Sequence, residues 1–358
     1  MFPDMTLWLK LLLAAAVSFT ISFLMTPHVK RFAEKVGAID IPKDERRIHS
    51  HPIPRMGGLA IFMGFIASCL IFADASTPLM GMMVGALIIA VMGAVDDIVS
   101  LSPWVKLAAQ VFAAIIAIRG GIYFDAISNP NILSDTNTIY IGQEISYFLT
   151  VLWIVGCTNA VNLIDGLDGL AVGVSAISSV TMLVVALFVS EPVVSVILAC
   201  LAGACFGFMP YNMNPAKIFM GDVGSQLLGF VLATVSIMGL FKFHTIITFF
   251  VPVMAMLVPL ADTAFAFTRR ILRGQSPFHA DKGHFHHRLL ALGLSQKQVA
   301  GVLYALSAIM GLLAVLLAGE GKTVRIICLV LMFIVSICVW FFVFRRMHKR
   351  LPEHKTEE

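Results

Sequence analysis

Long apolar runs recur along almost the whole chain, and they constrain its fold more than any other feature. About 20 mostly apolar residues in a helix cross the hydrocarbon core of a bilayer, and only helices and closed barrels satisfy their backbone hydrogen bonds there. By this measure we expect eleven spanning helices, at about 5–26, 56–73, 79–95, 105–119, 145–163, 170–189, 193–209, 225–241, 246–267, 299–318 and 324–343. The sequence therefore predicts an all-α, polytopic membrane bundle.

Composition agrees with a membrane protein and excludes an ordinary soluble domain. Of 358 residues, 59% are hydrophobic and 13% are charged, with a mean hydropathy of +0.91, far from soluble averages. The first apolar run is too long for the core of a signal peptide, and no small-residue cleavage site follows it. Six cysteines are scattered without a C-x-x-C pair, which argues against a disulfide framework or a zinc site. We expect one integral membrane domain over 1–358, with a loop at 268–298 and a basic tail at 344–358.

The distribution of basic residues predicts the orientation of these spans. If the N-terminus lies outside, 20 of the 25 Lys and Arg residues fall on the inner side, as the positive-inside rule requires. The polar clusters discussed below then also fall on the inner side. The sequence thus predicts a multi-pass protein with its chemistry and its C-terminus in the cytoplasm.

The stretch N-A-V-N-L-I-D-G-L-D-G-L-A-V-G, residues 159–173, places carboxylates and carboxamides between two apolar runs. Such groups are costly in a membrane and usually mark a functional site. On a helix, Asn162, Asp165 and Asp168 would follow one another at three-residue spacing and share a broad face. We expect these three side chains to form one polar strip along the helix.

Asp96 and Asp97 close the third expected span, and Lys106 follows nine residues after Asp97. Adjacent carboxylates repel one another unless a cation or a proton intervenes, so a divalent ion or a metal–phosphate complex is a natural partner. Lys106 is a candidate phosphate ligand. The alternatives are a solvated helix end and a lysine that only signals topology.

The segment P-Y-N-M-N-P-A-K-I-F-M-G-D-V-G-S, residues 210–225, sets Asp222 between glycines at the start of the eighth expected span. A carboxylate in such a turn can hold Mg²⁺, and the free N–H groups of a helix start favour phosphate oxygens. The alternative is that Asp222 only caps the helix.

The late loop carries H-A-D-K-G-H-F-H-H-R-L, residues 279–289. His284, His286, His287 and Arg288 form a dense group of hydrogen-bond donors suited to an anionic ligand. Two alternatives stay open, a zinc site and a loop that is basic because it is cytoplasmic.

Five carboxylates on the inner face, together with an Asn and the cationic cluster, describe a site for a metal-bound polyanionic substrate at a membrane surface. Phosphoryl transfer needs little beyond positioning and charge neutralisation. Without a phosphate-binding loop or a soluble nucleotide domain, a nucleotide sugar as donor and a lipid phosphate as acceptor fit better than ATP hydrolysis.

From about Ile41 to Leu294 the sequence resembles the polyprenyl-phosphate N-acetylhexosamine-1-phosphate transferases. Five stretches carry the resemblance in order: I-P-R-M-G-G-L-A at 53–60, V-D-D-I-V-S-L-S-P-W-V-K-L at 95–107, N-A-V-N-L-I-D-G-L-D-G-L at 159–170, P-A-K-I-F-M-G-D-V-G-S at 215–225 and S-P-F-H-A-D-K-G-H-F-H-H-R-L at 276–289. The resemblance implies an eleven-span bundle with a cytoplasmic active-site groove. The histidine motif resembles the UDP-N-acetylglucosamine (UDP-GlcNAc) branch, which starts teichoic acids, O antigens and related polymers, rather than the pentapeptide-transferring branch of peptidoglycan synthesis.

The resemblance also implies roles for single residues. Asp222 looks like the principal Mg²⁺ ligand, with Asn162 near the same ion and Mn²⁺ as an alternative metal. Asp96 and Asp97 resemble the catalytic pair near the lipid phosphate, and Lys106 resembles a phosphate-contacting lysine. Substrate-binding roles fall on Asp165 and Asp168 for the nucleotide and on His284, His286, His287 and Arg288 for the sugar-nucleotide.

The partners implied are UDP-GlcNAc, undecaprenyl phosphate and the lipid bilayer of a bacterial plasma membrane, with no nucleic acid and with a homodimer left open. The lipid phosphate would attack the sugar-linked phosphorus and release UMP. A two-step route through a phospho-aspartyl enzyme, the pentapeptide branch, a secondary transporter and a catalytically silent scaffold remain the alternatives.

Overall fold

The computed structural model describes residues 6–42, 51–124, 126–128, 138–240, 246–272, 284–319, 323–324 and 326–334. Its helices are α1 Leu7–Val36, α2 Gly58–Phe72, α3 Thr77–Val99, α4 Pro103–Arg119, α5 Gln143–Ile164, α6 Leu170–Phe188, α7 Pro192–Asn212, α8 Gly221–Val235, α9 Ile246–Ala255, α10 Leu257–Leu272, α11 Phe285–Ala291 and α12 Gln296–Ala318. A π-helical turn, η1 Ser236–Leu240, continues α8, and residues 326–334 are also helical.

Seven of the described helices are long and apolar enough to cross a membrane, which confirms a polytopic helical membrane protein. The predicted count of eleven spans stays a prediction, because the described helices do not establish it. The basic tail at 344–358 lies outside the described residues, as does the 273–283 part of the loop at 268–298.

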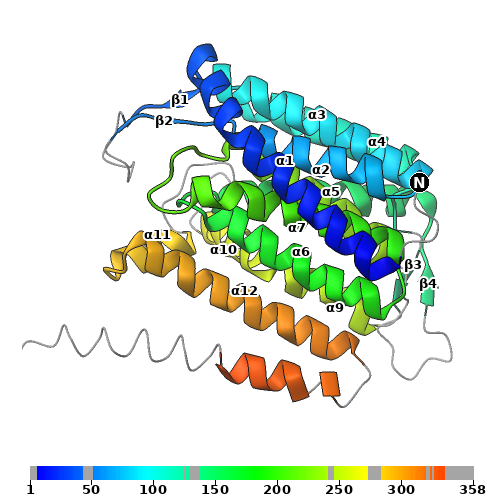
Figure 1. The fold of residues 1–358 in the computed structure, drawn as a ribbon. Coiled ribbons are helices and arrows are strands. Elements are labelled where there is room, and N and C mark those ends of the chain that lie inside the picture. Colours follow the sequence, from blue (N-terminus) through cyan, green and yellow to red (C-terminus); the bar gives the residue numbers. More distant parts are fainter. Residues whose placement is uncertain are drawn as a thin grey trace, which may run out of the picture.

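The long helices lie side by side and run back and forth between two ends of the bundle (Figure 1). The antiparallel pair β1 Ile39–Asp40 and β2 Ile53–Pro54 lies at one end with α11. The pair β3 Ala126–Ser128 and β4 Thr138–Tyr140 lies at the other end, where α1 begins. The C-terminal ends of α1, α3, α5 and α7 therefore meet the N-terminal ends of α2, α4, α6 and α8 at the first end.

Local sequence signals explain several helix boundaries. Ser102 precedes Pro103, and its Oγ accepts a hydrogen bond from the Val105 N–H, as expected of an N-cap followed by a proline at the first helical position. The expected span 246–267 is divided at Met256 into α9 and α10. Pro259 explains the division, because a proline is tolerated in the first turn of a helix and disrupts a helix interior.

Helices α7 and α8 form the centre of the bundle, and α1, α2, α3, α5 and α6 pack around them. Small residues allow the closest crossings. A Cβ added at Gly203 of α7 would lie 2.2 Å from the Ala15 carbonyl oxygen of α1, so the two backbones touch. Side-chain hydroxyls fasten the same contact, since Ser18 Oγ donates to the Cys200 carbonyl at 2.6 Å.

Candidate active site

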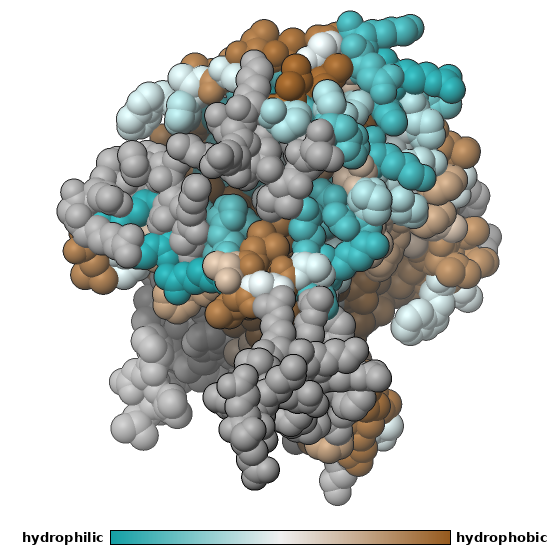
Figure 2. Space-filling view, turned by 90° about the vertical axis from the view of Figure 1, so that its left-hand side faces the viewer, coloured by the Kyte–Doolittle hydropathy of each residue, from teal (hydrophilic) through white to brown (hydrophobic). Residues whose placement is uncertain are grey.

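Hydrophilic side chains gather at the end of the bundle that holds β1, β2 and α11 (Figure 2). At this end the described residues surround a groove of about 400 Å³. Its lining comes from strand β1, from turns and from helices at this end of the bundle: Asp40, Arg55, Asp97, Asn162, Asp165, Gly166, Leu167, Asp168, Asn212, Phe219, Gly221, Asp222, His287 and Gln296.

The start of α8 is held against the start of α2 by backbone contacts. The Phe219 N–H donates to the Pro54 carbonyl at 2.8 Å, and the Gly58 N–H donates to the Met220 carbonyl at 2.8 Å. A Cβ at Gly58 would lie 2.0 Å from the Gly224 nitrogen. Only glycine permits this crossing, which fixes the position of Asp222 at the head of α8.

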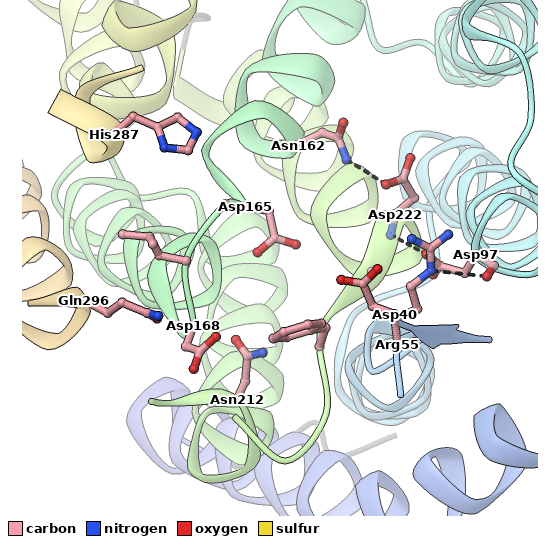
Figure 3. A pocket seen from close by; sticks show the side chains of 14 residues that line it. Asp40, Arg55, Asp97, Asn162, Asp165, Asp168, Asn212, Asp222, His287 and Gln296 are labelled. Carbon is pink, nitrogen blue, oxygen red and sulfur yellow. Dashed lines mark hydrogen bonds and ion pairs between the residues drawn. The ribbon is translucent and has the colours of Figure 1, made fainter. Parts of the chain in front are cut away.

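Asp97 reaches this helix start from α3 and caps it. Its Oδ1 accepts from the Asp222 N–H at 3.1 Å and its Oδ2 from the Val223 N–H at 3.4 Å. The Arg55 Nε lies 3.4 Å from Asp97 Oδ1, as seen in the close view (Figure 3). A carboxylate on an adjacent helix thus satisfies N–H groups that a helix start leaves without partners.

Lys106 joins two of the predicted carboxylates. Its Nζ lies 2.7 Å from Asp96 Oδ2 and 2.8 Å from Asp222 Oδ2. Asn162 Nδ2 donates to Asp222 Oδ1 at 3.2 Å, which leaves its carbonyl oxygen as the atom that could bind a cation. The structure therefore brings together residues 96, 97, 106, 162 and 222, as the sequence predicts.

These carboxylates suit a hard divalent cation. One oxygen from each of Asp96, Asp97 and Asp222 can lie within 4.8 Å of the others, and carboxylate oxygens are the usual ligands of Mg²⁺ and Mn²⁺. Asp165 adds a second indication, because burial, assisted by the negative charges of Asp222, Asp97 and Asp168, raises its pKa to about 8. A bound cation would relieve this concentration of negative charge.

The turn at 165–169 differs from the expected continuous polar face. Helix α5 ends at Ile164, Asp165 follows as its C-cap, and Gly169 has a φ of 76°, so the helical spacing does not extend to Asp168. Asp165 points into the groove (Figure 3). Asp168 lines the groove and also stabilises the loop between α7 and α8. Its Oδ2 accepts from Asn214 Nδ2 at 2.9 Å and from the Ala216 N–H at 3.0 Å.

Two of the described histidines of the late loop are buried, and the third lies at the groove. His284 Nδ1 donates to Asp262 Oδ2 at 2.8 Å. His286 is buried against Gly166, where an added Cβ would lie 2.5 Å from its Nε2, and burial lowers its pKa to about 4. His287 lines the groove, whereas Arg288 is exposed on α11. Of this predicted cluster, only His287 is among the groove-lining residues in the described part of the chain.

Sequence reasoning missed several residues of this site. Arg55 stands within the first matching stretch, I-P-R-M-G-G-L-A, and its basic side chain by itself indicates only topology. Asp262 lies inside an expected span, where any carboxylate is itself a functional signal. Asp40, Asn212 and Gln296 also line the groove, and no local pattern distinguishes them.

Comparisons with known proteins agree with this geometry. Residues 79–240 match the family described as glycosyl transferase family 4. The chain is 42% identical over 312 residues to the probable undecaprenyl-phosphate N-acetylglucosaminyl 1-phosphate transferase of Bacillus subtilis, covering 86% of this chain and 85% of that protein. It is 33% identical over 326 residues to the decaprenyl-phosphate N-acetylglucosaminephosphotransferase of Mycobacterium tuberculosis, covering 82% and 79%. A phospho-N-acetylmuramoyl-pentapeptide-transferase of Staphylococcus epidermidis is 30% identical over 320 residues, covering 84% and 96%.

Proposed function

The chain belongs to the polyprenyl-phosphate N-acetylhexosamine-1-phosphate transferases of glycosyl transferase family 4, in their N-acetylglucosamine branch, and on that premise we propose its reaction. The enzyme transfers GlcNAc-1-phosphate from UDP-GlcNAc to undecaprenyl phosphate. The products are undecaprenyl-diphosphate-GlcNAc and UMP. The observation that carries the proposal is the meeting of Asp96, Asp97, Asp222 and Lys106 at the head of α8, beside a groove at one end of a membrane bundle.

In the proposed reaction, an oxygen of the lipid phosphate forms a bond to the sugar-linked phosphorus. The bond from that phosphorus to the bridging oxygen breaks, and UMP leaves with the electron pair. A phosphate monoester has its second pKa near 6, so the acceptor is mostly dianionic at neutral pH. Asp96 and Asp97 position the acceptor or complete its deprotonation, and no strong base is required.

Asp222 and Asn162 would hold Mg²⁺, or Mn²⁺ in its place, and this ion would neutralise the donor diphosphate. In this assignment, Lys106 contacts a phosphate group of the substrates beside the same ion. Asp165 and Asp168 bind the nucleotide, while His284, His286, His287 and Arg288 bind or support the sugar-nucleotide. The chain acts as one membrane domain with its groove on the cytoplasmic side and its N-terminus outside.

The test uses purified protein in detergent with undecaprenyl phosphate, Mg²⁺ and UDP-GlcNAc labelled on the sugar-linked phosphate. A parallel sample contains labelled UDP-MurNAc-pentapeptide. We expect label in the lipid and release of UMP from the first donor only. Transfer from the second donor alone would place the enzyme in the pentapeptide branch, and a phospho-protein trapped with donor alone would replace the one-step reaction by a two-step one.

Asp222→Ala tests the metal assignment. We expect a loss of turnover that no Mg²⁺ concentration restores, because the carboxylate at the head of α8 is gone. Cys157→Ala is the control, since this cysteine is buried in α5 and has no proposed role. Full activity of Asp222→Ala would refute the assignment.

A further inference from the structure

Below the site, a second tier of polar residues lies among the same three helices, with two of its three members buried and Asn159 half-buried. Each site residue has a carboxamide one helical turn away, deeper in the bundle: Lys106 and Gln110 on α4, Asn162 and Asn159 on α5, Asp222 and Gln226 on α8. Gln110 is 2% exposed and Gln226 is 1% exposed. Amides at this depth cannot be explained by contact with water.

The three carboxamides form one continuous chain of hydrogen bonds that ends on Asp222. Asn159 Nδ2 donates to Gln110 Oε1 at 2.7 Å, and Gln110 Nε2 donates to Gln226 Oε1 at 2.8 Å. Gln226 Nε2 then donates to Asp222 Oδ2 at 2.8 Å. The chain therefore connects α5, α4 and α8 in turn.

The direction of this chain is set at its far end. Asn159 Nδ2 also donates to the Val155 carbonyl at 2.8 Å, and a backbone carbonyl can only accept. The amide nitrogen of Asn159 must therefore face the Val155 carbonyl and the side chain of Gln110. Gln110 consequently accepts from Asn159 and donates to Gln226. Gln226 is consequently obliged to present an N–H group to Asp222.

We propose that Gln110, Asn159 and Gln226 are positioning residues that hold the Asp222 carboxylate in its cation-binding orientation. The proposal rests on the proposed function, in which Asp222 is the principal metal ligand. Lys106 Nζ contacts Asp222 Oδ2 but also Asp96 Oδ2, so it can follow either carboxylate. Gln226 is directed at Asp222 alone among these carboxylates and holds Oδ2, while Asn162 donates to Oδ1, so the two amides together fix the rotation of the Asp222 side chain.

A purely structural role predicts different behaviour. Replacing two buried hydrogen-bond partners by apolar groups of the same shape is nearly neutral for stability. If the amides served only to join helices, methionine at positions 110 and 226 together would leave the site unchanged. If they position Asp222, metal binding weakens even where the fold is retained, because outer-shell partners of metal ligands are worth about 10- to 100-fold in metal affinity or activity.

The experiment measures Mn²⁺ binding to the purified full chain by electron paramagnetic resonance, without donor or lipid. We expect Gln226→Met to weaken Mn²⁺ binding about 10- to 100-fold, and Gln110→Met to weaken it less, since Gln226 still contacts Asp222. The double variant should bind no more weakly than Gln226→Met, because one break interrupts the whole chain. Ser18→Ala, which removes a buried hydrogen bond between α1 and α7, should bind Mn²⁺ like the wild type.

Turnover gives a second measurement on the same variants. We expect the Mg²⁺ concentration for half-maximal activity to rise in parallel with the Mn²⁺ dissociation constant, while the KM for the lipid acceptor stays unchanged. Wild-type Mn²⁺ affinity in a folded Gln226→Met would overturn the proposal, and Gln110→Met carries the test if Gln226→Met does not fold. A wild-type protein that binds Mn²⁺ yet transfers nothing would refute the proposed function and leave this comparison valid.

Discussion

Asp262 shows how one side chain can arrange a motif that is distant in the sequence. It is 2% exposed within α10. Its Oδ2 accepts from His284 Nδ1, and its Oδ1 accepts from the Phe285 N–H at 2.7 Å. One carboxylate thereby fixes the tautomer of His284 and holds the start of α11 beside the groove.

Asp262→Asn keeps the shape of this side chain and one acceptor. The substitution replaces the oxygen that accepts from His284 Nδ1 by an NH2 group, which cannot accept a hydrogen bond. The imidazole must therefore carry its proton on Nε2. We expect kcat/KM for UDP-GlcNAc to fall about 10- to 100-fold, in line with about 1.5–3 kcal/mol for a hydrogen bond to a charged group. Ser178→Ala, which removes the bond from Oγ to the Ala255 carbonyl, is the matched control. Wild-type kinetics in Asp262→Asn would contradict this role.

The buried imidazole of His286 makes the folded protein less stable at acid pH. Burial lowers its pKa to about 4, below the ordinary value near 6.5. Between these two values the unfolded chain binds more protons than the folded protein, so stability is lost as pH falls from about 6.5 toward 4. The loss amounts to about 2 kcal/mol at pH 5.0 and approaches about 3.4 kcal/mol below pH 4.

Thermal unfolding midpoints at pH 7.5 and 5.0 measure this contribution. We expect the wild type to lose more stability at pH 5.0 than His286→Gln, whose amide does not titrate. His28→Gln removes an exposed histidine on α1 and should behave like the wild type. Equal pH dependence of wild type and His286→Gln would show that the burial of this ring has no energetic consequence.

At the scale of elements, the site depends on how closely α2 crosses α8. An alanine at position 58 would bring its Cβ 2.2 Å from the Gly224 Cα, so the two helices must separate and carry Asp222 with them. A displacement of about 1 Å at a reacting centre can cost about 100-fold in rate. We expect a loss of this size in Gly58→Ala.

Gly156→Ala is the matched control for this substitution, because nothing lies within 4 Å of a Cβ at that position. In a helix interior this change removes a glycine and should stabilise α5 by about 0.5–1 kcal/mol. Transfer rate and thermal midpoint are measured for both variants. Normal turnover in Gly58→Ala would mean that the site tolerates separation of α2 from α8.

At the scale of the whole molecule, the sequence predicts the elements and the end of the bundle at which the chemistry gathers. Apolar length is a local property, and ten of the expected spans coincide with a described helix or with the pair α9 and α10. The contacts within the site could not be predicted, because they join distant residues. Lys106 and Asp222 are 116 positions apart, and the capping of α8 by Asp97 follows from packing rather than from any local signal.

Successive helices run back and forth between the two ends of the bundle, and the distribution of basic residues between these ends supports the proposed orientation. Among the described residues, Lys30, Arg31, Lys35 and Arg55 lie toward the groove end of the bundle, and Lys10 and Arg119 lie toward the other. A bilayer around this bundle would place the more basic end in the cytoplasm. The donor could then reach the groove directly from the cytoplasm.

Two matched cysteine variants test this orientation in whole cells. Glu34 lies near the groove end of α1, and Glu144 lies in the first turn of α5 at the opposite end; both are exposed. We expect a membrane-impermeant maleimide to label Glu144→Cys in intact cells and Glu34→Cys only after permeabilisation. The described native cysteines are buried, so the wild type measures the background. The reverse labelling pattern would place the groove outside, where a cytoplasmic nucleotide sugar could not reach it, and would refute the proposed donor together with the orientation.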